Sequence, residues 1–355
     1  MAADTVLIVG GGPAGLEAAR GVADLGKRAL LVEARSQLGG TPYSSSYATL
    51  TPDLQDTEEA MSGLLNDVLN HPLVDLRLGT RVIQSTGQQG DFDITLEKED
   101  GTTSQEKVGA VIIATGFQHF DPGRETQMYG YYEYDDVITL VDAEKMMKQG
   151  KIVRPSTGEA PEKVAFIQCV GSRDRQIGNK YRPKVCCGIA SKQSIEIKRM
   201  LPNSKVFIFY IDMRMYGFWE DQIYWKAQEE YKVNYIRGIV TEVIRKGDKL
   251  LIKGEDTTMG RPMEVQMDMV ILSVGMEPSK GTVNMSQVFS IPREEHGFLA
   301  TVGGPLDTVS TPVPGIFVAG AAAGPKDLED SISMGGAAAM KSVALLSRLQ
   351  RVTVG

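Results

Sequence analysis

Hydrophobic positions in the first third of the chain follow the pattern of a parallel βαβ unit. The β-branched run TVLIVG (5–10) predicts a buried strand, and PAGLEAARGVADLG (13–26) has helical spacing and ends on glycine. RALLVE (28–33) predicts a second buried strand. After an expected helix, TEEAMSGLLNDVL, the pattern changes to alternating strands with a hairpin at KEDGTT, and it closes on the apolar run VGAVIIATG (108–116).

The same layout recurs in the second half of the chain. KVAFIQ predicts a strand, CCGIASKQSIEIKRML a helix, KVFIFYI the next strand and EDQIYWKAQEEY a further helix. Alternating strands from 233 to 272 again lead to an apolar strand that ends in glycine. The chain finishes with the strand signal GIFVAGAAAG and a Gly/Ala-rich helix, SISMGGAAAMKSVALLSRL. We therefore predict the α/β class, with two Rossmann-like domains: a first domain of 1–158 and 281–355, and a second domain, 159–280, inserted into it.

Composition narrows the class of protein. A chain of 355 residues with 42% hydrophobic and 23% charged residues is typical of a globular protein with more than one core. Its net charge of −7 is spread along the sequence without a basic stripe, so nucleic-acid binding is not expected. Membrane insertion is not expected either, because no apolar run reaches about 18 residues. The first strand starts too early to leave room for a signal peptide, which predicts a cytoplasmic protein.

A glycine motif lies between the first strand and the first helix. GGGPAG places Gly10, Gly12 and Gly15 in the G-x-G-x-x-G spacing. The first glycine permits a tight turn, the second lets the backbone approach a pyrophosphate, and the third lets helix and strand pack closely. Glu33 ends the next strand, where a carboxylate can bond ribose hydroxyls. The first domain is therefore predicted to bind a dinucleotide.

Three later motifs favour FAD as this dinucleotide. LGGT (38–41) follows the ribose acid, where a flavin cofactor extends toward its ring, and ATG (114–116) ends the last strand of the domain. TPVPGIFVAGAAAG (311–324) resembles the C-terminal flavin motif of flavoproteins with two dinucleotide-binding domains, and the resemblance spans the fold, as in thioredoxin reductase. The last motif departs from the usual pattern, because Ala321 stands where an acid would contact the cofactor. We expect the backbone amides that open the last helix, near Ser331 and Ile332, to hold that end of FAD instead. The residues expected to bind FAD are Gly10, Gly12, Pro13, Ala14, Gly15, Glu33, Ala34, Arg35, Gly39, Gly40, Thr41, Val82, Ala114, Thr115, Gly116, Gly320, Ala321, Ser331 and Ile332.

The second domain lacks the features of a nicotinamide site. CVGSRD (169–174) retains only Gly171 where three glycines are needed, so NAD(P)H binding is not expected there. The chain also has no C-x-x-C pair. A disulfide between Cys169 and Cys186 stays possible.

All three cysteines lie in one segment, FIQCVGSRDRQIGNKYRPKVCC (166–187). FIQCVGSRD followed by a Cys-Cys pair, together with GPKDLEDS (324–331), resembles the flavin subunit of the heterodisulfide reductase family. The resemblance implies a four-cysteine iron–sulfur site in which Cys169, Cys186 and Cys187 are three ligands, and Arg182 stands at the position of the other. It predicts a 4Fe-4S cluster with three cysteine ligands. The alternative is that the cysteines are buried small hydrophobic residues.

The resemblance is strongest to the short flavin subunit of heterodisulfide-reductase-like complexes linked to sulfur oxidation. It implies an FAD-dependent electron-transfer subunit that acts with iron–sulfur and other reductase subunits and forms a homodimer. Lys326 precedes the last helix and is the candidate catalytic residue beside the flavin. Two alternatives stay open: an NAD(P)H-dependent flavin oxidoreductase, and a flavin-bound subunit that serves assembly. The electron donor, the electron acceptor and the fourth cluster ligand are not specified by the sequence.

Overall fold

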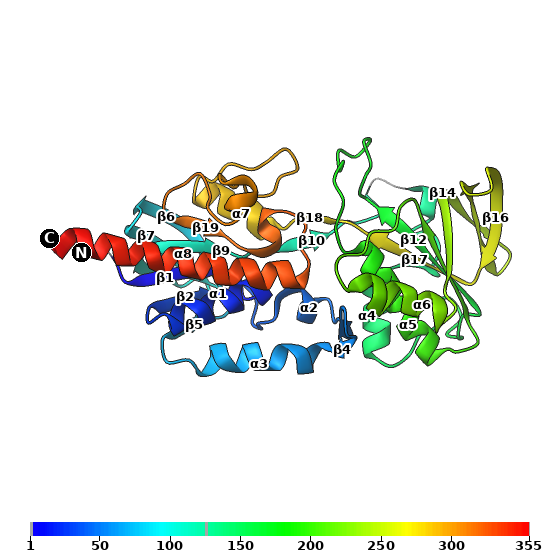
Figure 1. The fold of residues 1–355 in the computed structure, drawn as a ribbon, viewed down its shortest axis with the longest axis horizontal. Coiled ribbons are helices and arrows are strands. Elements are labelled where there is room, and N and C mark those ends of the chain that lie inside the picture. Colours follow the sequence, from blue (N-terminus) through cyan, green and yellow to red (C-terminus); the bar gives the residue numbers. More distant parts are fainter. Residues whose placement is uncertain (1–2, 125–126, 355) are drawn as a thin grey trace. The chain divides into compact units, whose positions relative to one another are not determined.

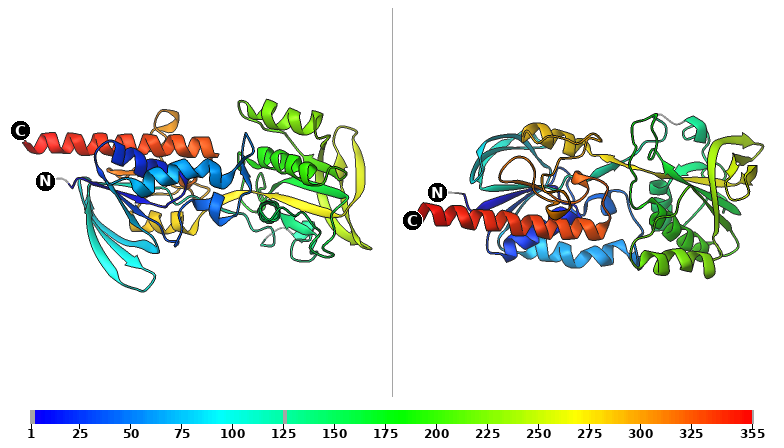
Figure 2. Two further views of the ribbon diagram at one scale, coloured as in Figure 1. Left: turned by 90° about the horizontal axis from the view of Figure 1, so that it is seen from below. Right: turned by 45° about the horizontal axis from the view of Figure 1, so that its top comes forward.

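The chain folds into two compact units (Figures 1 and 2), described from a computed structural model that covers residues 3–124 and 127–354. Unit 1 comprises Met1–Ser44, Glu58–Gln118 and Glu277–Gly355, and unit 2 comprises Ser45–Thr57 and His119–Met276. Each unit contains a parallel sheet with helices, and unit 2 is inserted into unit 1. The predicted α/β class with two Rossmann-like domains is therefore confirmed. Residues 1–2 and 355, assigned to the first domain by the sequence, lie outside the described residues.

Unit 1 is built on a five-stranded parallel sheet in the order β19-β9-β1-β2-β5. Its central strands are buried on both faces, which explains their continuous apolar sequences. Helices α1 and α8 run side by side against this sheet (Figure 2). The strands are β1 Thr5–Val9, β2 Arg28–Val32, β5 Val74–Arg77, β9 Ala110–Ile113 and β19 Ile316–Val318, and the helices are α1 Pro13–Asp24, α2 Gly40–Ser44, α3 Thr57–Asn70, α7 Lys280–Val288 and α8 Leu328–Val354.

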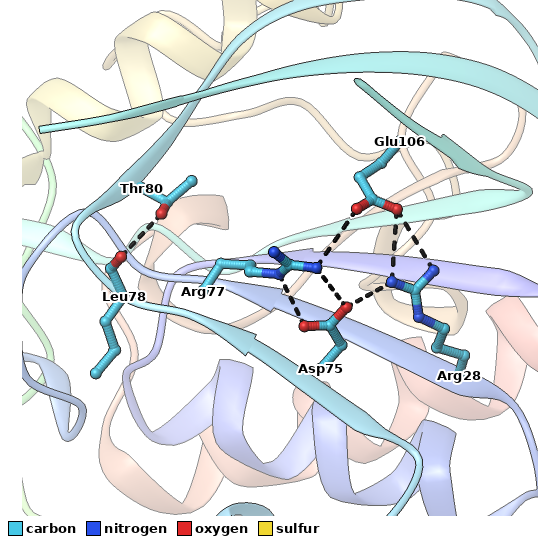
Figure 3. Close-up of polar contacts among 6 residues, drawn as sticks. All are labelled: Arg28, Asp75, Arg77, Leu78, Thr80 and Glu106. Carbon is cyan, nitrogen blue, oxygen red and sulfur yellow. Dashed lines mark hydrogen bonds and ion pairs between the residues drawn. The ribbon is translucent and has the colours of Figure 1, made fainter. Parts of the chain in front are cut away.

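A three-stranded antiparallel sheet completes unit 1, and a network of ion pairs joins it to the parallel sheet (Figure 3). Its strands are β6 Thr80–Gln88, β7 Asp91–Lys98 and β8 Thr103–Val108. Arg28 lies 2.5 Å from Asp75 and 3.4 Å from Glu106. Arg77 lies 2.8 Å from Asp75 and 3.6 Å from the same Glu106. Asp75 pairs with both arginines within the parallel sheet, and Glu106 of β8 pairs with the same two arginines from the antiparallel sheet.

Unit 2 is built on a seven-stranded sheet in the order β11-β17-β12-β13-β14-β15-β16. The first five strands pair in parallel, and β14, β15 and β16 form an antiparallel meander, as the predicted hairpin requires. The strands are β11 Val137–Thr139, β12 Lys163–Val170, β13 Lys205–Tyr210, β14 Asn234–Lys246, β15 Lys249–Asp256, β16 Arg261–Met267 and β17 Met269–Val274, with the short pair β3 Thr49–Leu50 and β4 Gln55–Asp56. The helices are α4 Leu140–Lys148, α5 Cys186–Met200 and α6 Lys226–Glu229, which follows a π-helical turn at Glu220–Trp225. Strands β10 Phe117–His119 and β18 Met276–Pro278 pair with each other.

The units differ from the predicted domains at their boundaries. Residues 119–158 belong to unit 2, although the sequence placed them in the first domain. The physical reason is that β11 extends the unit 2 sheet by pairing with β17, and α4 packs on α5. Residues 45–57 also belong to unit 2, and the second boundary lies at 276/277 instead of 280/281.

Helix α8 begins at Leu328, three residues before the predicted start at Ser331. Asp327 precedes it, and its carboxylate accepts a hydrogen bond from the amide of Asp330 at 2.7 Å. This capping interaction fixes the start of the helix. Although α8 is long, none of the helices in residues 3–124 and 127–354 combines the length and the apolarity of a membrane span.

Candidate functional site

The glycine turn between β1 and α1 has the geometry that its spacing predicts. Gly10 has a φ of 110°, and a Cβ atom there would lie 2.4 Å from the carbonyl oxygen of Ala114. A Cβ atom on Gly15 would lie 1.8 Å from the carbonyl oxygen of Gly10. At Gly12 the nearest atom to an added Cβ is the Cα of Gly40, at 3.5 Å. Gly10 and Gly15 are thus required by packing, whereas Gly12 faces open space that a ligand can approach.

The start of α1 presents its amides to this space. Gly12 is the N-cap residue, and it makes no side-chain capping bond. Pro13 occupies the first turn, where its missing N–H costs nothing. The amides of Ala14 and Gly15 and the helix dipole therefore give this position the partial positive charge that binds phosphate groups.

Glu33 places a carboxylate beside the same turn. Its Oε2 accepts a hydrogen bond from the amide of Gly11 at 2.6 Å, and its Oε1 accepts one from the amide of Arg35 at 2.9 Å. Ala34 is half-buried and Arg35 is exposed. Each carboxylate oxygen retains a lone pair for a ribose hydroxyl, which is the role predicted for Glu33.

The LGGT loop packs directly on the glycine turn. The amide of Gly39 donates to the carbonyl oxygen of Gly11 at 2.9 Å. Gly40 has a φ of 59°, and a Cβ there would lie 2.6 Å from the Cα of Gly12. Thr41 follows within α2. Two glycine-containing loops thus form one cradle of backbone, as the close approach of a dinucleotide requires.

The ATG segment closes the sheet beside the cradle. The amide of Ala114 donates to the carbonyl oxygen of Val9 at 2.8 Å. The hydroxyl of Ser279 donates to the carbonyl oxygen of Thr115 at 2.9 Å, and that of Thr282 donates to Gly116 at 3.1 Å. These bonds hold the segment rigid. The side chain of Val82, by contrast, is buried in the hydrophobic core with 4% exposure, so only its backbone is left to meet a ligand.

The C-terminal motif reaches the start of α1. Gly320 has a φ of 64°, and a Cβ there would lie 2.8 Å from the Cβ of Ala14 and 3.4 Å from the Oγ of Ser331. Ala321 is buried. The fold therefore brings Gly320, Ala321 and Ser331 to the dinucleotide cradle.

The expectation that the amides of Ser331 and Ile332 open the last helix is wrong. The amide of Ser331 donates to the carbonyl oxygen of Asp327 at 3.1 Å, and its hydroxyl donates to the same oxygen at 2.7 Å. Both residues lie inside α8, because Asp327 starts the helix earlier. The side chain of Ser331, rather than its amide, faces the Gly320 turn. Lys326 is half-buried just before the helix, and its role beside a flavin stays a prediction.

Unit 2 brings the three cysteines together. Cys169 lies near the end of β12 with a φ of 67°, and Cys186 and Cys187 start α5. The thiol of Cys186 interacts with those of Cys169 and Cys187, and these interactions shift the pKa values of all three. All three are free cysteines. They line one pocket together with Arg182, Pro183, Lys184, Arg214 and Tyr216, and its cavity volume of about 10 Å³ gives room for about one water molecule.

The thiols differ in acidity. A hydrogen bond from Cys186 and the charge of Arg173 hold the pKa of Cys169 at about 7, although burial opposes them. The pKa of Cys187 is also lowered, by Cys186 and by the backbone of Arg214. The pKa of Cys186 is raised, because its proton is shared with both neighbours and the group is buried. The helix dipole of α5 further favours thiolates at its start. The surroundings of Cys169 and Cys187 thus favour their thiolate form, which is the form that binds metal.

Arg182 occupies the fourth ligand position as a paired cation. It lies 2.9 Å from the carboxylate of Asp212, and Arg173 lies 3.1 Å from the same carboxylate. Cys187 contacts the carbonyl oxygen of Asp212 at 3.8 Å. Sequence reasoning missed Asp212 and Arg214, because they follow β13, far from the cysteines in the chain. Within the described ranges, no group of three or more His, Cys, Asp or Glu side chains has the geometry to hold a metal ion. Thiol side chains are the donor type that an iron–sulfur cluster needs, but this pocket has room for about one water molecule, which is less than a cluster occupies.

In unit 2 the loop that corresponds to the glycine turn is covered by a side chain of the same unit. Gly171 has a φ of 71°, and a Cβ there would lie 2.1 Å from the ring of Phe120. The start of α5, where a nicotinamide dinucleotide would place its phosphates, carries Cys186 and Cys187. The two units thus share a topology but present different groups at equivalent places.

Comparison with known proteins agrees with this geometry. Residues 4–156 match the family model of the pyridine nucleotide-disulphide oxidoreductases. An iron-sulfur subunit of the CoB–CoM heterodisulfide reductase of Methanopyrus kandleri is 30% identical over 97% of this chain and 64% of the relative. The corresponding subunit of the ferredoxin/F(420)H(2)-dependent CoB–CoM heterodisulfide reductase of Methanosarcina acetivorans is 30% identical over 97% of this chain and 53% of the relative. The chain thus spans less than two thirds of the length of these relatives.

Solved structures show the same fold. Thioredoxin reductase of Lactococcus lactis aligns with a TM-score of 0.64 over 97% of this chain and 99% of that chain, at 19% identity. Thioredoxin reductase of T. acidophilum aligns with a TM-score of 0.63 over 96% and 98%, also at 19% identity. Residues 4–156 thus match the pyridine nucleotide-disulphide oxidoreductase family, the chain has the thioredoxin reductase fold, and nearly its whole length is similar to these heterodisulfide reductase subunits.

Proposed function

We propose that this chain is a cytoplasmic, FAD-dependent electron-transfer subunit of a heterodisulfide-reductase-like complex that acts in sulfur oxidation. In this proposal unit 1 binds FAD, and unit 2 binds a 4Fe-4S cluster through Cys169, Cys186 and Cys187. The chain works as a homodimer with further iron–sulfur and reductase subunits. Bound FAD exchanges electrons singly or in pairs, and a cluster exchanges them singly.

The backbone cradle of unit 1 supports the FAD assignment. Gly12 leaves open space beside the start of α1, and Glu33 holds its carboxylate at the neighbouring Gly11 amide. The amides at the start of the helix would bind the pyrophosphate, and Glu33 would orient the ribose. Gly320 and Ser331 reach the same helix start from the C-terminal motif.

The convergence of the cysteines is the observation that carries the electron-transfer proposal. Cys169 is on a different element from Cys186 and Cys187, yet all three line one pocket and the thiol of Cys169 interacts with that of Cys186. Packing alone does not require all the cysteines of the chain to share one pocket, nor two of them to have lowered pKa values. Cluster binding requires thiolates, and it requires a wider pocket than the one described here.

The alternative of an NAD(P)H-dependent oxidoreductase has less support. Gly171 is covered by Phe120, and the start of α5 carries thiols. The other alternative is a subunit that serves assembly without catalysis. It gives no reason for the lowered pKa values of Cys169 and Cys187.

Iron and acid-labile sulfide in anaerobically purified protein test the proposal. We expect both to be present, and each single Cys→Ser substitution should lower both while FAD stays bound, because the FAD cradle lies in the other unit. Iron-free anaerobic protein, with serine variants that behave like it, would assign the cysteines to packing.

A second variant tests the fourth position. Arg182→Cys removes the cation that pairs with Asp212 and restores a fourth thiolate. We expect its cluster to resist oxygen longer than that of the wild type, because no iron is left with an exchangeable ligand. The decay of the absorbance near 400 nm in air measures this difference. Faster bleaching of the variant would contradict the assignment of residue 182 to the cluster.

A further inference from the structure

The net charge of the chain conceals a local excess of basic residues beside the cysteine pocket. The loop between β12 and α5 has five basic residues and one acidic residue within 173–184, in a chain whose net charge is −7. The basic residues are Arg173, Arg175, Lys180, Arg182 and Lys184, and the acidic residue is Asp174. Arg175 and Lys180 are exposed.

The fold adds further cations to this loop. The carboxylate of Asp212 is shared by Arg173 at 3.1 Å, Arg182 at 2.9 Å and Arg237 at 3.9 Å. Its pKa is lowered chiefly by the hydrogen bond from Arg182, and Arg214 contributes as well. One carboxylate thus faces four guanidinium groups, so most of their positive charge is left uncompensated by it.

Tyr216 lines the same pocket, and two further aromatic residues, Phe218 and Trp219, follow it in the chain. Trp219 is buried against Gly188 near the start of α5, which anchors the segment that follows β13. In this segment the exposed fractions of Tyr216 and Phe218 are 41% and 79%. The ammonium group of Lys184 lies 5.2 Å from the centre of the Tyr216 ring. Arginine and exposed aromatic residues are the types enriched in protein–protein interfaces.

We propose that this surface, the basic loop 173–184 with Arg214, Tyr216, Phe218 and Arg237, is the docking site of a small acidic redox protein. Charge complementarity favours an acidic partner, since opposite potentials steer association and fix orientation. A second copy of the chain is disfavoured, because a symmetric contact would place two basic surfaces together. That the partner is a redox protein rests on the proposed function, because the thiols line the pocket beneath this surface.

Binding of an acidic plant-type [2Fe-2S] ferredoxin to the full chain, purified without air, tests the docking site. We expect binding that weakens strongly between about 20 mM and about 200 mM salt, where screening shortens the reach of charges. The double variant Arg175→Glu/Lys180→Glu should raise the Kd at least about tenfold, since both side chains are exposed and neither lines the pocket. The matched control is Lys205→Glu/Lys246→Glu, which makes the same charge change at exposed positions at the start of β13 and the end of β14.

Several results would overturn the docking site. They are equal Kd values for the two double variants, a Kd independent of salt, or wild-type protein that does not bind the ferredoxin. The wild type could instead bind polyuridylate, or vesicles with anionic lipid, and fail to bind ferredoxin. If Arg175→Glu/Lys180→Glu then loses that binding, the surface belongs to those partners instead. Because the Kd is measured without electron transfer, docking can succeed even where iron analysis refutes the cluster, and the two failures are distinguishable.

Discussion

At the scale of single residues, neighbouring glycines of one motif have different physical roles. Gly15 has no room for a side chain, because a Cβ atom would lie 1.8 Å from a backbone oxygen. Gly12 has an ordinary extended conformation, with a φ of −80°, and its only close neighbour would be 3.5 Å from a new Cβ. Stability and cofactor binding are therefore separable within GGGPAG.

We predict that Gly12→Leu folds normally but is purified without FAD, because the leucine side chain occupies the place of the pyrophosphate. Gly15→Ala should instead lower the free energy of unfolding by about 2–4 kcal/mol, since backbone must move to admit the methyl group. Denaturant titration and the FAD content of each variant measure these effects. Stoichiometric FAD in Gly12→Leu would place the cofactor elsewhere.

At the scale of elements, a buried ionic network attaches residues 45–57 to the helices of unit 2. Lys192 on α5 is 2% exposed; its ammonium group lies 2.5 Å from Glu144 of α4 and 3.4 Å from Glu196. The same group donates to the carbonyl oxygen of Thr49 at 2.9 Å. The amide of Ala48 donates to Glu144 at 2.9 Å. One cation thus holds three elements together and pairs with two buried carboxylates.

Removal of this cation should destabilise unit 2 selectively. Lys192→Met leaves Glu144 and Glu196 buried without their partner, which should lower the free energy of unfolding of unit 2 by about 3–5 kcal/mol. Trp219 and Trp225 are the only tryptophans and both lie in unit 2, so their fluorescence reports its unfolding. Lys205→Met, at an exposed position, is the control. Identical midpoints for the two variants would mean that the network contributes little.

At the scale of the whole molecule, the two units share a strand–helix–strand arrangement but differ at the start of the helix that follows the central strand, α1 after β1 and α5 after β12. In unit 1 the start of α1 is a glycine turn with open space, whereas in unit 2 the start of α5 carries cysteines. A nicotinamide dinucleotide would therefore meet thiols, and not a glycine turn, at the start of α5.

We predict that NADH alone reduces the bound flavin slowly or not at all. Stopped-flow bleaching of the flavin absorbance measures the rate, with dithionite as the control that shows the flavin to be reducible. Fast, stoichiometric reduction by NADH would favour a dehydrogenase over an electron-transfer subunit.

The sequence by itself determined those features that depend on local chemistry. The period of apolar residues predicts the buried strands of both sheets. The spacing of Gly10, Gly12 and Gly15 predicts the turn, because a Cβ atom has no room at Gly10 or Gly15 and Gly12 leaves the helix start open to a ligand. The clustering of the thiols also follows from the sequence, since the strand that ends near Cys169 and the helix that starts at Cys186 meet at one edge of a parallel sheet.

Only the tertiary structure decided the features that depend on contacts between distant residues. Residues 119–158 join unit 2 because β11 pairs with β17, which is more than a hundred residues away in the chain. The start of α8 is set by Asp327, a residue that could equally have been part of a loop. Arg182 is held by Asp212, and charges that appear scattered along the sequence gather around that carboxylate. Ion pairs and strand order depend on which distant segments pack against each other. The period of hydrophobic residues along the chain does not specify those contacts.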